Sequence, residues 1–355
     1  MNKKNRLIIV FVILYSALLL HTTKSYSLTH DVFEYELINE NEIIITGLVQ
    51  DVTEVENLVI PDEIDGKIVT IIDKYAFHDC QIIKGNLKLP QKLLTIENGA
   101  FYNCSLLTGD LIIPDSVEKI GDMAFGYCSG FNGKLVLSKS LKKIDMNAFY
   151  YCSSLIGDLI IPDSVEEIGD SAFYNCSGFN GNIKLSNNLL KIERRAFSDC
   201  SSLIGDLIIP DSVIEIDYIA FKSCSNLNGI LKLSSNLLKI GSSSFENCSS
   251  LVGDLIIPNS VEEIGSDAFS NCIGFNGILK LSNKLSKLYR DTFYNCTSLT
   301  GDLIIPDSVE EIDSDVFSNC SGFNGALKLS NNLIKIGTNA FENCTLLTGD
   351  LIIPD

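Results

Sequence analysis

Residues 155–176 read LIGDLIIPDSVEEIGDSAFYNC, and close variants of this segment fill most of the 355-residue chain. A cysteine closes each variant, and every interval between successive cysteines is 24 residues. A phenylalanine stands three residues before each cysteine, from Phe77 to Phe341. Self-similarity at a fixed period of this length is typical of a solenoid that stacks one short unit along an axis. We therefore predict one elongated array rather than several globular domains.

The unit itself predicts the path of the chain. Leu159–Ile161 is a short strand, and Pro162–Ser164 ends it, because proline lacks the ladder donor and aspartate and serine favour turns. Val165–Ile168 is a second extended stretch, after which Gly169–Asp170 turns again. Apolar residues at one-turn spacing in Ala172–Cys176 predict a short helical turn. The fold is thus predicted to be a leucine-rich-repeat solenoid, a repeat α/β fold of mostly short parallel strands with one short helical turn per 24-residue unit.

Two versions of the unit alternate, so the full period is 48 residues. One version reads GDLIIPDSVEEIG at residues 157–169, and the other reads GNIKLSNNLLKIE at residues 181–193. One column of the second stretch alternates in charge: Lys143, Glu167, Lys191, Glu215, Lys239, Glu263, Lys287, Glu311 and Lys335. Stacked rungs lie roughly 4.8 Å apart. We therefore expect a lysine on both sides of each glutamate and no unfavourable like-charge neighbours.

The strand centres alternate between apolar and basic residues and form the candidate partner-binding face. Its members are Ile112, Val136, Ile160, Lys184, Ile208, Lys232, Ile256, Lys280, Ile304 and Lys328. Repeated, rigid surfaces suit extended protein partners. The alternative is that these side chains are exposed on a solvated sheet and bind no partner.

Both ends of the chain depart from the repeat. Residues 1–27 combine a basic start, the apolar run Leu7–Leu20 and small residues at the exit, which predicts a signal peptide. Residues 28–57 lack the unit and are predicted to cap the first rung. Residues 58–355 hold about twelve repeats, the last incomplete. A solenoid without a cap leaves an apolar face open, so we expect a further segment, another chain or self-association to cover the C-terminal face.

Charge limits the classes of partner. The formal charge is −18, and removal of the four basic residues in 1–27, where no acid occurs, gives −22. Such an excess of acid opposes binding to nucleic acid or to an anionic membrane surface. No segment beyond the predicted signal peptide is apolar enough to span a bilayer.

The cysteine column has three possible roles. An even number of cysteines in a secreted chain suggests disulfides. However, an in-register column puts neighbouring Cβ atoms near the rung spacing, whereas a bridge requires about 3.8 Å. A strict 24-residue spacing also matches no zinc pattern. We favour a ladder of buried thiols that act as small apolar residues, with disulfides in some pairs and metal binding as the alternatives.

Two other repeated features are weak evidence for function. The sequons Asn103, Asn175, Asn247, Asn295, Asn319 and Asn343 exist because the repeat does, and a protist rather than a bacterium would be needed to glycosylate them. The acidic residues Asp110, Asp158, Asp206, Asp254 and Asp302 recur every second rung, roughly 10 Å apart. That spacing is too long for two of them to share one calcium ion. They are predicted to be turn residues.

Catalysis has little support in the sequence. The only histidines are His21, His30 and His78. No nucleophile–base pattern or phosphate-binding loop interrupts the repeat. We therefore predict no catalytic residue, no cofactor and no metal; an enzyme would require a further domain.

The segment IPDSVEEIGDSAFYNC at residues 161–176, its relatives, and EIDGKIVTIIDKYAF at residues 63–77 resemble the BspA-type leucine-rich-repeat family. The resemblance covers about 300 residues. It implies a surface protein of a bacterium or protist, since several members of that family take part in adhesion to host cells or matrix proteins. The usual unit there is 23 residues, and the additional residue here lies just before the strand.

These observations lead to one functional hypothesis and one competitor. The first is a secreted or cell-surface array that binds an extracellular protein or glycoprotein, with adhesion as its role. The second is a structural coat or spacer with no dedicated ligand. Fold alone does not decide between them.

Overall fold

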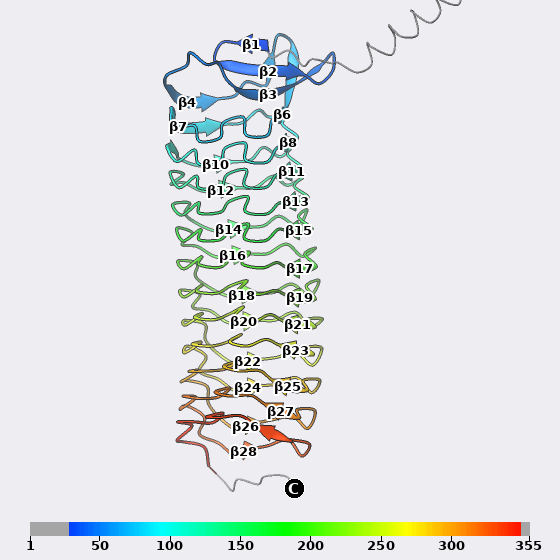
Figure 1. Ribbon diagram of the computed structural model, residues 1–355, viewed down its shortest axis with the longest axis vertical. Helices are drawn as coiled ribbons and strands as arrows, with labels where there is room; N and C mark the ends of the chain where they lie inside the picture. The colour runs from blue at the N-terminus through cyan, green and yellow to red at the C-terminus, as the bar shows by residue number, and fades with distance from the viewer. Residues whose placement is uncertain (1–27, 349–355) are drawn as a thin grey trace, which may run out of the picture.

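The computed structural model describes residues 28–348. Successive 24-residue rungs stack into one straight column, with the N-terminal strands at one end and the last rung at the other (Figure 1). The predicted signal peptide and the final residues 349–355 lie outside the described residues. The solenoid of parallel strands is therefore confirmed.

The strands fall into an N-terminal group and two columns. The N-terminal group is β1 (Leu28–His30), β2 (Phe33–Leu37), β3 (Glu42–Leu48), β4 (Val55–Val59), β5 (Glu63–Ile64), β6 (Lys67–Ile72), β7 (Ile83–Lys88), β8 (Thr95–Ile96) and β9 (Leu107–Thr108). The first strand column is β10 (Leu111–Ile112), β12 (Leu135–Val136), β14 (Leu159–Ile160), β16 (Ile183–Lys184), β18 (Leu207–Ile208), β20 (Leu231–Lys232), β22 (Leu255–Ile256), β24 (Leu279–Lys280), β26 (Leu303–Ile304) and β28 (Leu327–Lys328). The second strand column is β11 (Lys119–Ile120), β13 (Lys143–Ile144), β15 (Glu167–Ile168), β17 (Lys191–Ile192), β19 (Glu215–Ile216), β21 (Lys239–Ile240), β23 (Glu263–Ile264), β25 (Lys287–Leu288), β27 (Glu311–Ile312) and β29 (Lys335–Ile336).

The two columns pair differently, although every rung contributes one strand to each. The first column pairs two by two, as β10–β12, β14–β16, β18–β20, β22–β24 and β26–β28, each in parallel register. The second column runs in longer sheets that end at β15, β23 and β29. The 48-residue alternation in sequence therefore appears in the structure as pairs of rungs along the first column.

The rest of each rung, from the second strand to the cysteine, is an arc of successive turns. In the arc of Gly169–Cys176, Ala172 N donates to Gly169 O at 3.2 Å, and Cys176 N donates to Phe173 O at 3.3 Å. The amides of Phe173 and Asn175 instead donate to the next rung, to Ala196 O and Ser198 O, both at 2.9 Å. Ser171 and Asn175 have φ of 56° and 55°.

These arcs take the place of the short helical turn that the spacing predicted. Left-handed residues at every fourth position interrupt any helix, because a right-handed helix requires negative φ throughout. Alternate amides are also used between rungs rather than within one. Residues 28–348 accordingly contain no helix.

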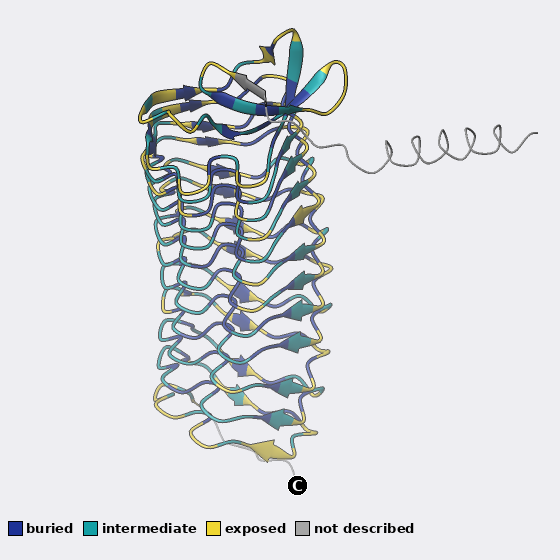
Figure 2. Cartoon of the chain, turned by 45° about the horizontal axis from the view of Figure 1, so that its top comes forward, coloured by how far each residue is buried: buried dark blue, intermediate teal, exposed yellow. Residues whose placement is uncertain are grey.

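Aligned columns of identical side chains fill the interior. The rings of Phe149, Phe173 and Phe197 stack with centroids 5.1 and 5.6 Å apart and nearly parallel planes. Their side chains have no exposed surface. Figure 2 shows the buried residues inside the column and the exposed ones at its bends. Each unit is therefore covered by its neighbours, which is how a short repeat gains a core.

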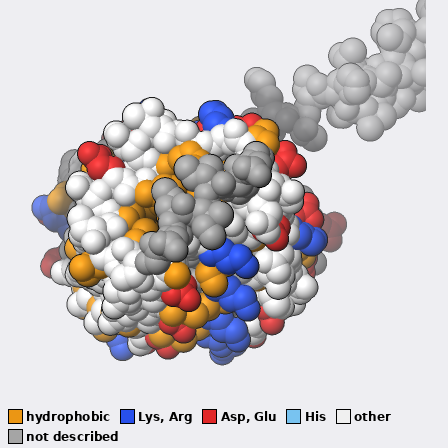
Figure 3. All heavy atoms as spheres, turned by 90° about the horizontal axis from the view of Figure 1, so that it is seen from below, with side chains coloured by type: hydrophobic (Ala, Val, Ile, Leu, Met, Phe, Trp, Pro, Cys, Tyr) orange, Lys and Arg blue, Asp and Glu red, His pale blue; other side chains and the backbone are white. Residues whose placement is uncertain are grey.

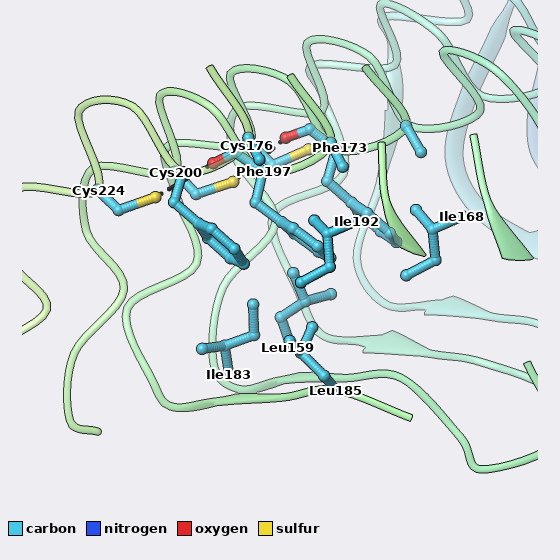
Figure 4. Packing of buried hydrophobic residues seen from close by; sticks show 14 of the residues in the cluster. Leu159, Ile168, Phe173, Cys176, Ile183, Leu185, Ile192, Phe197, Cys200 and Cys224 are labelled. Carbon is cyan, nitrogen blue, oxygen red and sulfur yellow. Dashed lines mark hydrogen bonds between the residues drawn. The ribbon is translucent and has the colours of Figure 1, made fainter. Parts of the chain in front are cut away.

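The cysteines form a ladder of free thiols beside the phenylalanines. All twelve are free, and ten are buried. Cys200 Sγ donates to Phe173 O and Cys224 Sγ donates to Phe197 O, both at 3.2 Å (Figure 4). The same bond joins every cysteine from Cys104 to Cys344 to the phenylalanine 27 residues earlier. The favoured interpretation as buried thiols is confirmed, and the disulfide alternative is wrong for this structure.

At the N-terminal end, antiparallel strands continue the second column past the first rung. β1, β2 and β3 are antiparallel, and β3 then pairs in parallel with β6. β4 already pairs with β7 as a rung strand does, although Val55–Asn57 falls within the predicted cap. The first repeat is longer than the others, since Leu58 is in register with Leu87, 29 residues later. It contains the hairpin of β5 and β6, turned by Asp65 and Gly66, both with positive φ.

Candidate interaction surface

The predicted binding face is a single surface, formed by the outward residue of each strand in the first column. In β14, Leu159 is 1% exposed and Ile160 is 52% exposed, because successive side chains of a strand point to opposite sides. Register pairs Ile160 with Lys184 and Ile208 with Lys232. The structure brings all ten predicted residues into this column.

A second exposed apolar row lies beside this column and was missed in the sequence. Its isoleucines are Ile156, Ile204, Ile230 and Ile278, which are 39–48% exposed. Isolated bridges such as Asn182–Ile204 and Ile278–Thr300 run through this row and connect neighbouring rungs. The sequence does contain a signal for this row, because an apolar residue recurs beside the glycine that precedes the strand.

A shallow groove of about 400 Å³ lies between the two rows. Its outer walls include Ile278, Lys280, Ile304 and Pro306, and Asp302 lies at one end. It sits where the β22–β24 pair meets the β26–β28 pair. Two of the ten predicted residues therefore line a hollow rather than a flat sheet.

The lysines of this face form no ion pair with any residue in 28–348. Backbone hydrogen bonds first, and then the charge of the nearby Lys184, Lys232 and Lys328, lower the pKa of Asp163, Asp211 and Asp307. Among the described residues, no carboxylate lies within ion-pair distance of Lys184, Lys232, Lys280 or Lys328. Neighbouring isoleucines are 41–54% exposed. The face thus presents positive charge at every second rung of its C-terminal two thirds, roughly 10 Å apart, between exposed apolar side chains.

The lysines of the second column, in contrast, are paired. Lys143 Nζ lies 2.8 Å from Glu167 and 3.0 Å from Asp145, and these two carboxylates raise the pKa of that lysine. Lys191 contacts Asp217 at 2.8 Å. Seen from below, the largest gathering of Lys and Arg side chains is one band with hydrophobic side chains beside it (Figure 3). Basic groups therefore follow columns instead of being scattered.

The expectation that each glutamate has a lysine on both sides is only partly confirmed. Glu311 contacts Lys287 at 3.1 Å and Lys335 at 3.5 Å. Glu167 contacts lysine on the N-terminal side alone, at Lys143, 2.8 Å away. For Glu167 the second column breaks between β15 and β17, so it has no strand partner in the next rung. Glu215 also contacts lysine on one side alone, at Lys191, although β19 is paired with β21.

The recurring aspartates are turn residues, as predicted. Asp158 Oδ1 accepts a hydrogen bond from Asn182 N at 2.8 Å, and Asn180 Oδ1 accepts one from Gly157 N at 2.9 Å. A Cβ on Gly181 would collide with Asp158 Oδ1, so this bond requires glycine there. Asp110, Asp206, Asp254 and Asp302 make the same bond. No group of three or more metal-ligating side chains occurs in residues 28–348.

The six sequon asparagines all lie in the arcs. Each has positive φ, between 55° and 64°. Some bond along the column, as Asn295 Nδ2 does to Asn271 Oδ1 at 2.9 Å. Their glycosylation stays a prediction.

The comparisons with known proteins agree with this architecture. A family profile described as BspA type leucine rich repeat region, with six copies, matches residues 50–180, 142–273 and 252–354. A solved leucine-rich repeat protein from Bacteroides ovatus ATCC 8483 is 25% identical, with a TM-score of 0.63 over 91% of this chain and 93% of that one. A leucine rich cell surface protein from Faecalibacterium prausnitzii A2-165 is also 25% identical, with a TM-score of 0.58 and the same coverage. No curated protein matches the sequence.

Residues 28–348 also contain no helix with the length and apolar character that a membrane crossing would require.

Proposed function

This chain belongs to the BspA-type leucine-rich-repeat family, and from that premise we propose that it is a secreted or cell-surface binding module. Its ligand is an extracellular protein or glycoprotein, and adhesion to host cells or matrix is its role. The array acts as a binding protein and not as an enzyme.

One observation carries this proposal: the free lysines of the first strand column. Elsewhere on this acidic chain, lysines such as Lys143 and Lys191 lie within 3.0 Å of carboxylates. Lys184, Lys232, Lys280 and Lys328 instead stand among exposed isoleucines. An acidic ligand surface with apolar side chains would neutralise these lysines and cover the isoleucines together. Charge complementarity of this kind favours specificity and fast association.

The repetition of the face suggests how affinity arises. Four of the five two-rung pairs offer one isoleucine and one lysine in register. A ligand that engages several pairs binds with an effective concentration gain at each further contact. We therefore expect individually weak contacts and a strong dependence on the number of rungs engaged. The family relationship and the cell-surface relative support this reading.

The test is saturable binding of the full chain to immobilised matrix glycoproteins and to host cells. A variant with Lys184, Lys232, Lys280 and Lys328 changed to Glu should lose binding by at least tenfold. A matched control changes four exposed lysines that lie outside the column, Lys92, Lys139, Lys142 and Lys284, to Glu. The net change in charge is identical, so binding by the control should persist. A folded array that binds no ligand of this kind would leave a structural coat as the better account.

A further inference from the structure

Seven aromatic side chains cluster on the arcs of the first five rungs. They are Tyr75, His78, Tyr102, Tyr127, Tyr150, Tyr151 and Tyr174, and we call them the tyrosine patch. Neighbouring rings are in contact along it, with centroids 4.8 Å apart for His78–Tyr102, 5.2 Å for Tyr127–Tyr151 and 5.1 Å for Tyr150–Tyr174. Six of the twelve tyrosines of the chain are in this patch.

The repeat does not require aromatic residues at these positions. In later rungs with a buried phenylalanine the next residue is Ser198, Lys222, Glu246, Ser270 or Ser318, and it is a tyrosine once, at Tyr294. Two methionines, Met123 and Met146, also lie in the patch and are 40% and 44% exposed. The patch is therefore an apolar surface confined to one part of the column, which is a mark of an interaction site.

A pocket of about 510 Å³ opens at the N-terminal end of the patch. The rings of Tyr75, His78 and Tyr102, the thioethers of Met123 and Met146, and the carboxylate of Asp122 line it. The Tyr75 ring lies against Gly99, where an added Cβ would collide with it. Asp122 Oδ1 accepts a hydrogen bond from Met146 N at 3.1 Å, which holds the carboxylate in place.

Aromatic faces with a carboxylate beside them favour a cation that has an apolar stem. This chain already places one such group there, since Lys74 Nζ lies 5.0 Å from the centre of the Tyr75 ring. The formal charge of −18 attracts basic ligands at long range. The rings further along the patch stack on one another in the pairs Tyr127–Tyr151 and Tyr150–Tyr174, which leaves fewer free ring faces. That arrangement suits a protein ligand better than the flat face of a sugar.

The far end of the patch carries the opposite charge. Tyr150, Asp170, Arg194 and Arg195 line a second hollow of about 280 Å³ together with Tyr127. Arg194 Nε lies 2.7 Å from Asp170, and among the described residues no carboxylate lies within 4 Å of Arg195. Arg195 is five rungs from Tyr75, or roughly 24 Å at the rung spacing.

We propose that the tyrosine patch binds an extended protein segment that places a Lys or Arg side chain in the pocket of Tyr75, Tyr102 and Asp122. An acidic group of the same segment meets Arg195. Asp122 is three rungs from Arg195 and Tyr75 is five rungs from it. An extended chain covers about 3.3 Å per residue, so the basic and acidic residues of the ligand stand about four to seven positions apart. Tyrosine and methionine supply the contact area between them, as is common in protein interfaces. This site is on different residues from the first strand column and does not depend on it.

The experiment uses a displayed library of random twelve-residue peptides selected against the full chain. Enriched peptides should share a Lys or Arg followed, or preceded, by Asp or Glu about four to seven positions away. The best peptide, synthesised and labelled, is then titrated by fluorescence anisotropy. Asp122→Asn keeps the hydrogen bond from Met146 and should weaken binding about tenfold; Tyr102→Ala should weaken it further.

Two controls make the result decisive. Tyr294→Ala changes the tyrosine at the same position of a later rung and should leave binding unchanged. The variant with Glu at Lys184, Lys232, Lys280 and Lys328 should also bind the peptide, even if it fails on matrix glycoproteins. The proposal is overturned if no basic peptide is enriched, if Asp122→Asn binds normally, or if a panel of immobilised glycans binds through Tyr102 instead.

Discussion

The arcs of two rungs, one around Phe149 and one around Phe269, share an interior and differ outside. Both phenylalanines are fully buried, and the residue two positions later is left-handed in each, with φ of 59° for Tyr151 and 60° for Asn271. The first arc, however, has the partly exposed Tyr150 and Tyr151, whereas the second has Ser270, which is only 4% exposed, and the partly exposed Asn271. The same core and backbone therefore accommodate different outer residues, so the outer residues are available for binding.

The surroundings of the later arc also differ in charge. Glu246, Asp267, Asp291 and Asp315 line one hollow there, with Arg290 among them. Partial burial and the nearby carboxylate of Asp291 raise the pKa of Asp267. One continuous arc face is thus aromatic near the N-terminal end and acidic near the other.

The largest effect should come from the shared interior. Phe221→Ala removes one ring from a stack that contacts Phe197 and Phe245 at 5.3 and 5.6 Å. We expect a loss of about 3–5 kcal/mol in the free energy of unfolding, because a cavity remains. Urea unfolding followed by circular dichroism measures it. Tyr150→Ala on the outer side should lose about 1 kcal/mol or less, and an equal loss in both would contradict the division between core and surface.

A smaller loss should follow from crowding the contact between two rungs. Gly181→Ala would place a Cβ 2.7 Å from Asp158 N and in collision with Asp158 Oδ1. We expect about 1–3 kcal/mol of destabilisation from overpacking, measured by the same unfolding experiment. Gly126→Ala is the comparison, since the nearest atom there is Tyr102 Cδ2 at 3.3 Å. Equal stability of the two variants would show that the aspartate bond is dispensable.

The thiol ladder predicts a pH dependence. Burial raises the pKa of Cys152, Cys200 and Cys248 to about 12, from an ordinary value of 9.0. The contribution of these thiols to the free energy of unfolding is complete below pH 9. It falls as the pH rises toward 12, because the thiols of the unfolded chain lose their protons at a lower pH than those of the folded chain. Thermal unfolding at pH 8 and pH 10.5 measures the fall. A variant that combines Cys152→Ala, Cys200→Ala and Cys248→Ala should lose less stability between the two pH values. An equal loss in this variant would mean that the titration of lysine and tyrosine causes the fall.

The smallest effect should come from exchanging the outer residues between arcs. Asn271→Tyr copies Tyr151 into the later rung at a partly exposed position, and the buried Ser270 is left unchanged. Surface changes away from the core usually alter stability by about 0.5 kcal/mol or less. Differential scanning calorimetry should therefore give nearly the same Tm as the parent chain. A large drop would mean that the arc surface is constrained by its neighbours after all.

Much of this fold could be predicted from the sequence, since leucine, isoleucine and phenylalanine at fixed offsets define both the rung and its interior. The outward column containing Ile160 and Lys184 followed from strand alternation alone. The arcs were harder, because the spacing of Ala172, Phe173 and Cys176 fits a helical turn as well as successive turns. The deciding bonds run to another rung, where local sequence gives no signal.

Two further features were hidden for different reasons. The break between β15 and β17 depends on the packing between rungs. Local sequence therefore gave no sign that Glu167 would form an ion pair on one side alone. The tyrosine patch was missed because its residues depart from the consensus of the repeat, and the prediction was made from the consensus. Comparing each rung with the average at one position, such as Tyr150 against Ser270, would have revealed it.

Two hydrogen bonds between neighbouring rungs limit how such a gene can change in length. They join Asp158 to Asn182 and Asn180 to Gly157. Each bond requires one version of the repeat to meet the other. Recombination that deletes 24 residues would bring two like versions together, set lysine beside lysine in the second column and lose an aspartate bond. A deletion or duplication of 48 residues restores every contact. Variation in length among descendants of this array should therefore proceed in whole pairs of rungs.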